Sequence, residues 1–405
     1  MSGLGGNRRV TQTPEPSRDR LTELFLELTA LASPSRHERS VADAIIHHLA
    51  AVGVDVCEDD TGRRIDGDAG NLWCVVRGTG ATPCLALGAH MDTVELSGEL
   101  QPQLVGGVFS NKAHTILGSD DKAAVVAMLH ATELLVHTGE PFPTYEMFFT
   151  VSEETGLVGA KHLGEHVLSS PFAAVLDSSG PVGGITVKAP SQQGLQAVFR
   201  GRAAHAGVEP ERGRSAILGA AKAIAAMKLG RVDDETSANI GIIHGGTASN
   251  IIPDYCEIKG ECRSHNDEKL AHTAAAMVDA LQEGAAHAGV DVDIALVHEY
   301  RAFALTGRAP VVKLAKAAVA ALGLEPRLLT GGGGSDANIL NARGLPSVNL
   351  DAGMMQVHSP DEYLTLDDLD RLCRLTLEMI RLAPKFGPRG SSTGASLSSG
   401  IPHDE

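Results

Sequence analysis

The stretch "TYEMFFTVSEETGLVGAKHL", residues 144–163, leads an apolar strand into two adjacent glutamates, Glu153 and Glu154, and then into a glycine. A continuous apolar strand of this kind is typical of a parallel sheet whose two faces are both covered. Neighbouring carboxylates repel each other, so a site that keeps both of them needs a positive charge nearby. The stretch therefore predicts an α/β fold with a charged site at the end of a strand.

The same alternation of strands and helices extends over most of the chain. Two helices are expected at the start, in "SRDRLTELFLELTALAS" (17–33) and "SRHERSVADAIIHHLAAVG" (35–53), the second opened by a capping box of Ser35 and Glu38. Alternating apolar strands and helices predict a mainly parallel sheet with helices on both faces. Further strands are expected in "NLWCVVRG" (71–78), "PCLALGAH" (83–90), "FAAVLD" (172–177) and "PSVNLDAG" (346–353).

The middle of the chain follows a different order. Residues 185–299 read as strand, helix, two strands, helix and strand, which is the split ferredoxin-like motif. This segment is expected to be an inserted domain that interrupts a larger domain made of residues 18–184 and 300–386. The ends, 1–17 and 387–405, are rich in Gly, Ser and Pro and are expected to be disordered.

Composition limits the classes of function. The net charge of −16 would repel a phosphate backbone, so a nucleic-acid partner is not expected. No run of 18 uncharged apolar residues is present, which argues against a membrane span. The basic N-terminal residues are not followed by an apolar block, and the six cysteines contain no C-x-x-C pair. A cytoplasmic protein with reduced thiols is expected.

Charged and polar side chains gather at the ends of the predicted strands. His90 and Asp92 lie two residues apart in an extended segment, so both side chains point the same way. Open α/β sheets bind ligands at the carboxyl ends of their strands. Carboxylates that converge there need a compensating positive charge, which a metal centre supplies. The acidic residues in such positions are Asp120, Asp121, Glu153, Glu154 and Asp177.

This set of side chains suits zinc or a similar divalent ion, and His358, just after the last strand, offers a second imidazole. A carboxylate that bridges would hold two ions about 3.5–4 Å apart. A single H-x-D pattern is common by chance, and a lone aspartate at a strand end is more often a turn or helix cap. The coincidence of five such features favours the metal centre.

Seven segments together resemble the dinuclear zinc peptidases and deacylases grouped around peptidase T, carboxypeptidase G and acetylornithine deacetylase. They occur in order between about residues 20 and 385, and the D-D-K-A form is similar to the peptidase T-like branch. The segments are "GAHMDTV", "GSDDKAAV", "SEETGLVGAKHL", "VLDSSG", "GRAAHAGVEPERGRSAI", "HGGTASNIIPD" and "HSPDEYLTLDDL".

The resemblance implies a ligand set for two metal ions. One ion would be held by His90 and Asp177, the other by Glu154 and His358, and Asp120 would bridge them. Zinc is the expected metal, with cobalt or manganese as alternatives.

The resemblance also implies catalytic roles. Asp92 would orient the imidazole of His90. Glu153 would stay free of metal, accept a proton from the bridging water and deliver it to the leaving amine. His205 would stabilise the tetrahedral oxyanion, in several dimeric relatives from the neighbouring subunit. The resemblance thus implies that residues 185–299 are a lid or dimerisation domain on a catalytic, metal-binding domain, and a homodimer through the inserted domain is expected.

Asn250 and Arg263 match family positions that hold the backbone or the carboxylate of the substrate. Arg263 suits a carboxylate because guanidinium binds it through two hydrogen bonds. From the residues alone, either one could be an ordinary strand residue, and His205 a surface imidazole.

The function implied is that of a metallopeptidase that hydrolyses short peptides, an aminopeptidase or tripeptidase-like exopeptidase. Aspartate rather than glutamate at position 177 leans toward aminopeptidases within this group. A deacylase of N-acyl amino acids or a carboxypeptidase would use the same machinery and stays open. A non-catalytic binding protein is disfavoured because the base, Glu153, is present.

Overall fold

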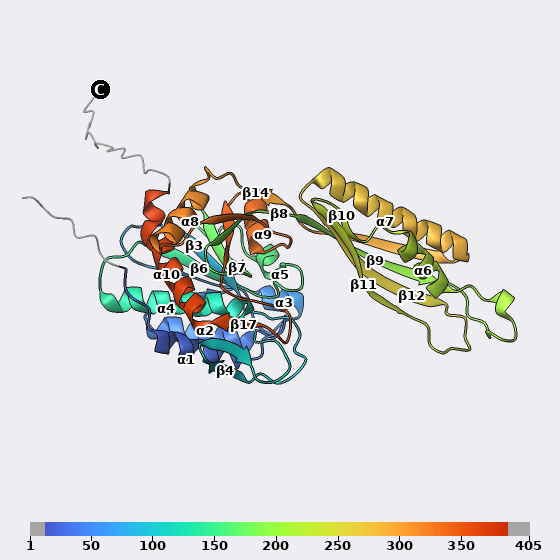
Figure 1. Ribbon diagram of the computed structural model, residues 1–405, viewed down its shortest axis with the longest axis horizontal. Helices are drawn as coiled ribbons and strands as arrows, with labels where there is room; N and C mark the ends of the chain where they lie inside the picture. The colour runs from blue at the N-terminus through green and yellow to red at the C-terminus, as the bar shows by residue number, and fades with distance from the viewer. Residues whose placement is uncertain (1–12, 388–405) are drawn as a thin grey trace, which may run out of the picture.

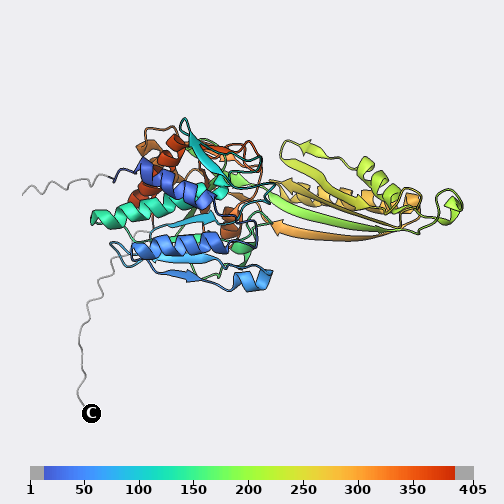
Figure 2. The same cartoon turned by 90° about the horizontal axis from the view of Figure 1, so that it is seen from below.

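The computed structural model describes residues 13–387. Its helices and strands form two bodies along the long axis of the molecule, a larger one around a nine-stranded sheet and a smaller one around a five-stranded sheet (Figures 1 and 2). The expected α/β fold with an inserted α+β domain is therefore confirmed. The disorder expected for 1–17 and 387–405 concerns segments that lie largely outside the described residues.

The larger sheet is parallel at its centre and antiparallel toward its margins. Its strands are β1 (Val56–Glu58), β2 (Leu72–Val76), β3 (Ala86–His90), β6 (Tyr145–Thr150), β7 (Ala173–Ser178), β8 (Gly184–Ala189), β14 (Phe303–Ala304), β15 (Arg327–Thr330) and β16 (Ser347–Asp351). The order is β1-β2-β6-β3-β7-β16-β8-β14, with β15 also paired to β8. Strands β6, β3, β7 and β16 run parallel to their neighbours within this group. Their carboxyl ends consequently meet at one edge of the sheet.

Helices cover both faces of this sheet. Alternate residues of a strand point to opposite faces, so Leu87 and Phe149 lie in one core while Ala86 and Phe148 lie in another. The first core includes side chains from α1 (Arg18–Thr29), α2 (Arg39–Ala51), α4 (Ser119–Thr138), α8 (Pro310–Ala321) and α10 (Leu366–Leu382). The second is covered by α9 (Asp336–Ala342), against which α5 (Val158–His162) packs. Two short helices complete this body, α3 (Thr61–Ile65) and η2 (Ala383–Lys385).

The capping box expected at Ser35 and Glu38 is wrong. Helix α2 starts at Arg39, and Glu38 precedes it without capping it. Partners from distant loops take both side chains instead: the Ser35 hydroxyl donates to Asp92, 2.6 Å away, and the Glu38 carboxylate accepts from the backbone N–H of Ser152 at 2.9 Å. Buried donors and acceptors must be paired, so these contacts displace the local cap.

The smaller body contains β9 (Ser191–Arg200), β10 (Gly230–Asp233), β11 (Thr236–Gly245), β12 (Tyr255–Ser264) and β13 (Asp291–Tyr300), with η1 (Pro210–Arg212), α6 (Ala216–Ala226) and α7 (Asp267–Ala288). The strand order β10-β11-β12-β9-β13 is antiparallel throughout, and α6 and α7 lie together on one face (Figure 2). This is the split ferredoxin-like order that the sequence predicts. The five-stranded sheet begins at Ser191, six residues after the expected boundary, because β8 still pairs with β16 in the larger sheet.

A separate three-stranded sheet lies near the start of α4. It consists of β4 (Pro102–Val105), β5 (Val108–Asn111) and β17 (Tyr363–Thr365) in the order β17-β5-β4. Its strand β17 follows the loop that carries His358, so the sheet fixes that loop near the start of α4. All six cysteines are free thiols. Within residues 13–387 no helix is both long and apolar enough to cross a lipid bilayer.

Candidate metal centre

Five side chains from separate segments meet at the carboxyl edge of the larger sheet. His90 ends β3, Glu154 follows β6, and Asp177 is the second-last residue of β7. Asp120 opens helix α4, and His358 comes from the loop after β16. The structure thus brings together every residue that the sequence analysis expects to bind metal, and the parallel centre of the sheet is the reason.

The first group of potential ligands consists of His90, Asp120 and Asp177. The Nε2 atom of His90 lies 3.1 Å from Asp120 Oδ1 and 3.5 Å from Asp177 Oδ1. All three side chains are nearly inaccessible to solvent. One imidazole nitrogen and two carboxylates around a small space are a ligand set that suits zinc and similar divalent ions.

The second group shares Asp120 with the first and adds Glu154 and His358. His358 Nε2 lies 3.2 Å from Asp120 Oδ2 and 2.8 Å from Glu154 Oε1. The two oxygens of Asp120 therefore face different histidines, one in each group. This is the placement that a bridging carboxylate needs.

Hydrogen bonding orients the ring of His90. Its Nδ1 lies 2.9 Å from the backbone oxygen of Asp92, which can only accept, so Nδ1 carries a proton and donates it. The Nε2 atom then faces two carboxylates, where it needs either a second proton or a cation. Burial alone would lower the pKa of His90, but Asp120, Asp177 and Asp92 outweigh burial and raise it.

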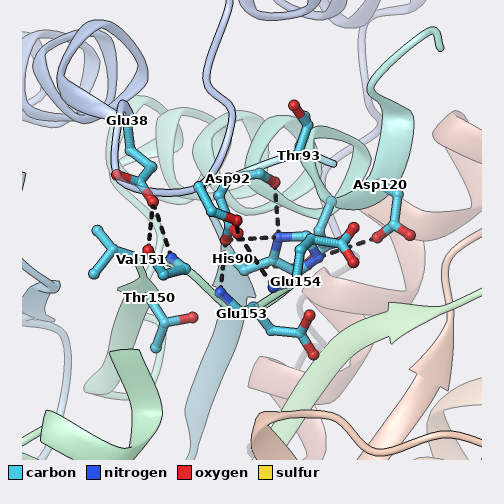
Figure 3. Close-up of polar contacts among 12 residues, drawn as sticks. Glu38, His90, Asp92, Thr93, Asp120, Thr150, Val151, Glu153 and Glu154 are labelled. Carbon is cyan, nitrogen blue, oxygen red and sulfur yellow. Dashed lines mark hydrogen bonds and ion pairs between the residues drawn. The ribbon is translucent and has the colours of Figure 1, made fainter. Parts of the chain in front are cut away.

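Asp92 also determines how the two adjacent glutamates diverge. Its Oδ1 accepts from the backbone N–H of Glu153 at 2.9 Å, and its Oδ2 accepts from that of Glu154 at 3.2 Å. With the backbone held in this way, the Glu154 side chain points toward His90 and Asp120, and the Glu153 side chain points to another side (Figure 3). Glu153 belongs to neither ligand group but lines the adjacent cavity.

The crowding of carboxylates shows in their pKa values. Burial, reinforced by the charge of Asp177, raises the pKa of Glu153 well above its usual range. Burial also raises the pKa of Glu154, and it raises that of Asp177 to about 7. Hydrogen bonds that His358 donates to Asp120 and Glu154 raise the pKa of its imidazole to about 10. Without a cation, this edge of the sheet would hold carboxylates that resist ionisation.

The residues fit a pair of divalent ions. A bound cation favours the charged carboxylate and the neutral imidazole, which would reverse these pKa shifts. Asp121 adds to the case, since its Oδ2 accepts from the backbone N–H of His90 at 3.2 Å while its buried Oδ1 has no hydrogen-bond partner. So many acidic groups around two imidazoles leave a local excess of negative charge that two dications offset.

Several supporting residues were not assigned from the sequence. Glu38, just before α2, accepts from the backbone N–H of Ser152 in the loop of the two glutamates (Figure 3). Ser35 acts indirectly, since its hydroxyl donates to Asp92, which binds the backbone of both glutamates. Asp336 accepts a hydrogen bond of 2.5 Å from Thr150 at the end of β6, and its other oxygen is buried without a partner. The signal for Asp336 was its place in "GGGGSDAN", where a glycine-rich segment leads into a helix. Ser35 and Glu38 gave a misleading signal, because they match a helix cap.

A cavity of about 650 Å³ opens beside the ligand groups and extends to the inserted domain. Its wall includes Glu153 and the glycine-rich segment 331–335 from the larger body, and Arg263 and Tyr300 from the smaller one. The guanidinium of Arg263 is paired through two hydrogen bonds, of 2.8 and 3.1 Å, with the carboxylate of Glu261. Of the residues expected to bind substrate, Arg263 therefore reaches the cavity, where its guanidinium is already paired with Glu261.

The other two expected residues, His205 and Asn250, lie elsewhere. They are neighbours, since Ala206 N–H donates to the Asn250 carbonyl at 2.9 Å, and both are exposed. Their loops follow the far ends of β9 and β11, whereas Gln192 at the near end of β9 lines the cavity. Ser191 and Arg200 are the two ends of the ten-residue strand β9 and lie roughly 30 Å apart. Within one chain, His205 is therefore remote from the ligand groups.

The sequence pattern of Peptidase family M20/M25/M40 matches residues 86–382. The uncharacterized protein YqjE of Bacillus subtilis strain 168 is 40% identical to this chain over 366 residues, which cover 90% of this chain and 99% of that protein.

Two crystal structures resemble the whole described fold. The aminopeptidase PepT from Bacillus cereus ATCC 10987 superposes with a TM-score of 0.79 at 38% identity, covering 91% of this chain and 99% of that one. A tripeptidase from Staphylococcus aureus subsp. aureus mu50 superposes with a TM-score of 0.85 at 35% identity, covering 92% and 100%.

Proposed function

The chain belongs to peptidase family M20/M25/M40, and from this premise we propose that it is an exopeptidase that uses two divalent metal ions to cleave short peptides at their amino terminus. One observation carries the proposal: two groups of three ligands share Asp120, and Glu153 stands outside both groups at the wall of a cavity. The aminopeptidase and tripeptidase described above, at 38% and 35% identity, support peptides as the substrate.

The ligand assignment follows the two groups. His90 and Asp177 would hold one ion, Glu154 and His358 the other, and Asp120 both. When bound, two such ions lower the pKa of a water molecule and polarise the scissile carbonyl. Imidazole and carboxylate ligands suit zinc, and cobalt or manganese accept the same donors.

Glu153 would move the proton. Its carboxylate is buried and lines the cavity, and Asp92 fixes its backbone N–H at 2.9 Å. From this position Glu153 accepts the proton of the attacking water and then delivers it to the amine that leaves. The inserted domain contributes Arg263, whose guanidinium would bind the substrate carboxylate in place of Glu261.

His205 would act on the site of a second subunit. Its distance from the ligand groups within one chain, and its exposure, support donation to a partner molecule in a homodimer. The outer half of β11 supports such a dimer, because β10 pairs only with its first residues and Ile242 and Ile243 are 55% and 53% exposed. Asn250, hydrogen-bonded next to His205, would reach the same partner's substrate.

An N-acyl amino acid deacylase or a carboxypeptidase would use the same ligands and the same base. The identity of the relatives favours the peptidase, while the cavity itself accommodates both kinds of amide. Zinc as the native ion, the homodimer and the cytoplasmic location stay predictions from the sequence.

The two glutamates provide the test of the mechanism. Glu153→Gln keeps the shape of the side chain but cannot accept a proton, so kcat should fall by ~10² to 10⁴ with both metal ions retained. Glu154→Gln should weaken one metal position, and excess zinc should partly restore its activity. Metal content and steady-state kinetics are measured on both variants. If Glu153→Gln loses metal while Glu154→Gln keeps it, the two roles are reversed.

Substrate class is tested separately. The metal-loaded protein is incubated with a mixed library of dipeptides, tripeptides and N-acetyl amino acids, and the products are identified by mass spectrometry. We expect release of amino-terminal residues from the peptides. Hydrolysis confined to N-acetyl amino acids would replace the peptidase by the deacylase.

A further inference from the structure

Glu362 is a buried carboxylate that connects the loop of His358 to the segment of Asp120. It is only 2% exposed. Its Oε2 accepts from the backbone N–H of Leu117 at 2.8 Å and of Gly118 at 2.9 Å. Its Oε1 accepts from the N–H and the hydroxyl of Ser119, at 2.7 and 2.5 Å, and from the N–H of Asp120 at 3.2 Å. One side chain thus receives every backbone donor of the segment that presents Asp120.

The other end of this connection is the loop of His358. Met355 and Tyr363 close the loop with two backbone hydrogen bonds of 3.0 Å, and the N–H of Glu362 donates to Ser359 at 3.1 Å. The side chain of His358 is half exposed, and its Nε2 atom faces Asp120 and Glu154. The position of its imidazole therefore depends on how this loop is attached to the rest of the molecule.

Asp120 and His358 face each other across the second ligand group, with Asp120 Oδ2 3.2 Å from His358 Nε2. Glu362 lies four residues after His358 and binds the backbone of Asp120. Hydrogen bonds from N–H groups to a buried carboxylate are short and strong, and removing the acceptor leaves several buried donors unpaired. Any displacement of Glu362 would change the separation of these two ligands.

We propose that Glu362 is a positioning residue that fixes His358 relative to Asp120 and thereby sets the metal affinity of the second ligand group. The proposal rests on the dinuclear centre proposed above. A purely structural role as a carboxylate at the start of α4 is the competing explanation, since helix N-termini favour negative charge. The two differ in whether metal binding changes apart from stability.

The chain contains a matched control in Glu146. This residue is also 2% exposed and also accepts five hydrogen bonds, from the backbone and hydroxyl groups of Ser169 and Ser170. It lies in β6, near the end opposite to the one that leads to Glu153 and Glu154. Glu146→Gln therefore weakens an equivalent set of contacts in the same body without touching either ligand group.

The experiment compares zinc binding by metal-free wild-type protein, Glu362→Gln and Glu146→Gln, using calorimetry and a competing chromophoric chelator. Melting temperatures of the metal-free proteins record the structural effect. We expect wild type and Glu146→Gln to bind two ions alike. Glu362→Gln should bind one ion about 10- to 100-fold more weakly, the range found when a residue that orients a ligand is removed, and keep the other.

The outcomes separate the two proposals. If wild type binds fewer than two ions, the dinuclear centre is wrong. If wild type binds two ions and Glu362→Gln binds both as tightly as Glu146→Gln does, the positioning role is wrong. Should Glu362→Gln fail to fold, Ser119→Ala removes a single hydrogen bond to Glu362, and an unchanged affinity for both ions in that variant would equally overturn the role.

Discussion

The nine-stranded and five-stranded sheets differ in whether the ends of their strands bring functional side chains together. In the larger sheet, parallel strands end at a common edge, and the side chains at the ends of β3, β6 and β7 belong to two groups of potential ligands that share Asp120. In the smaller sheet, antiparallel strands end alternately at two edges about 30 Å apart. Arg263 lies at the edge that reaches the cavity, and His205 lies at the other. Strand direction therefore decides which residues can share a site within one chain.

The largest effect is expected where the parallel strands converge. Asp120→Ala removes the carboxylate common to both ligand groups, so both ions and nearly all activity should be lost. The decrease in activity should exceed the ~10²-fold typical of losing a residue that only orients a ligand. Elemental analysis of the purified variant checks this prediction. Two equivalents of zinc in Asp120→Ala would disprove the bridging role.

The next effect tests the far edge of the smaller sheet. His205→Ala should lower kcat by ~10² to 10³, as loss of an oxyanion donor does. If His205 serves a partner subunit, mixing inactive His205→Ala with inactive Glu153→Gln and allowing subunits to exchange should restore about a quarter of wild-type activity, since half of the dimers then contain one intact site. Activity that stays at zero in the mixture would place His205 in its own subunit's site or outside catalysis.

A smaller effect is expected at the near edge of the same sheet. Glu261 occupies the guanidinium of Arg263 and also accepts a hydrogen bond of 2.6 Å from Gln192. Glu261→Gln weakens this pair, so a substrate carboxylate should compete more easily. KM for peptides with a free carboxyl terminus should fall by roughly tenfold, the equivalent of one hydrogen bond to a charged group. The same peptides with a terminal amide are the control, and an equal change for both sets would exclude Arg263 as the carboxylate partner.

The smallest effect, on the free energy of unfolding, is expected when one ion pair is removed from each body. Glu133 accepts from Arg20 at 2.7 Å and contacts His130 at 3.1 Å in the larger body. Burial opposes the shift, but His130 and Arg20 lower the pKa of Glu133 from 4.5 to about 2. A folded-state pKa below the unfolded one stabilises the protein above pH 4.5, and this stabilisation is lost as the pH falls toward 2.

Urea unfolding measures how much each of the two ion pairs contributes to the free energy of unfolding. Glu133→Gln should lower the free energy of unfolding by about 1–2 kcal/mol at pH 7, and by less at pH 3. The pair Arg200–Asp293 of the smaller body spans 2.9 Å but is largely exposed at both ends, so Asp293→Asn should change the unfolding free energy by less than about 0.5 kcal/mol at either pH. Equal effects at pH 7 and pH 3 for Glu133→Gln would contradict the assigned shift.

The fold, and the gathering of acidic residues at one edge of the larger sheet, could be predicted from local patterns, whereas the choice of five metal ligands rests on the resemblance to the dinuclear zinc peptidases. Apolar strands alternating with helices specify parallel strands, and parallel strands deliver His90, Glu154 and Asp177 to one edge. The order of elements in the insert likewise specifies its ferredoxin-like sheet. These inferences need only the direction of each strand.

The supporting contacts could not be predicted because they join segments that are remote in sequence. Ser35 and Glu38 satisfy a local cap rule, yet Asp92 and Ser152 offer them buried partners that only the tertiary structure reveals. Glu362 gave no local signal either, since its five donors lie more than 240 residues earlier in the chain. The placement of His205 likewise depends on how the two bodies are arranged.

The junction between the sheets also shapes the order of folding. Ser191 accepts a hydrogen bond of 2.6 Å from the N–H of Ala302, 111 residues later, so the inserted sheet begins and ends at one point. The contact between Asp177 and Asn349, which brings β7 to β16, spans 172 residues. Once the insert has folded, the loop that this contact must close is about threefold shorter, which saves roughly 1 kcal/mol of chain entropy. A folded insert therefore lowers the entropic cost of assembling the larger sheet, to which it contributes no strand.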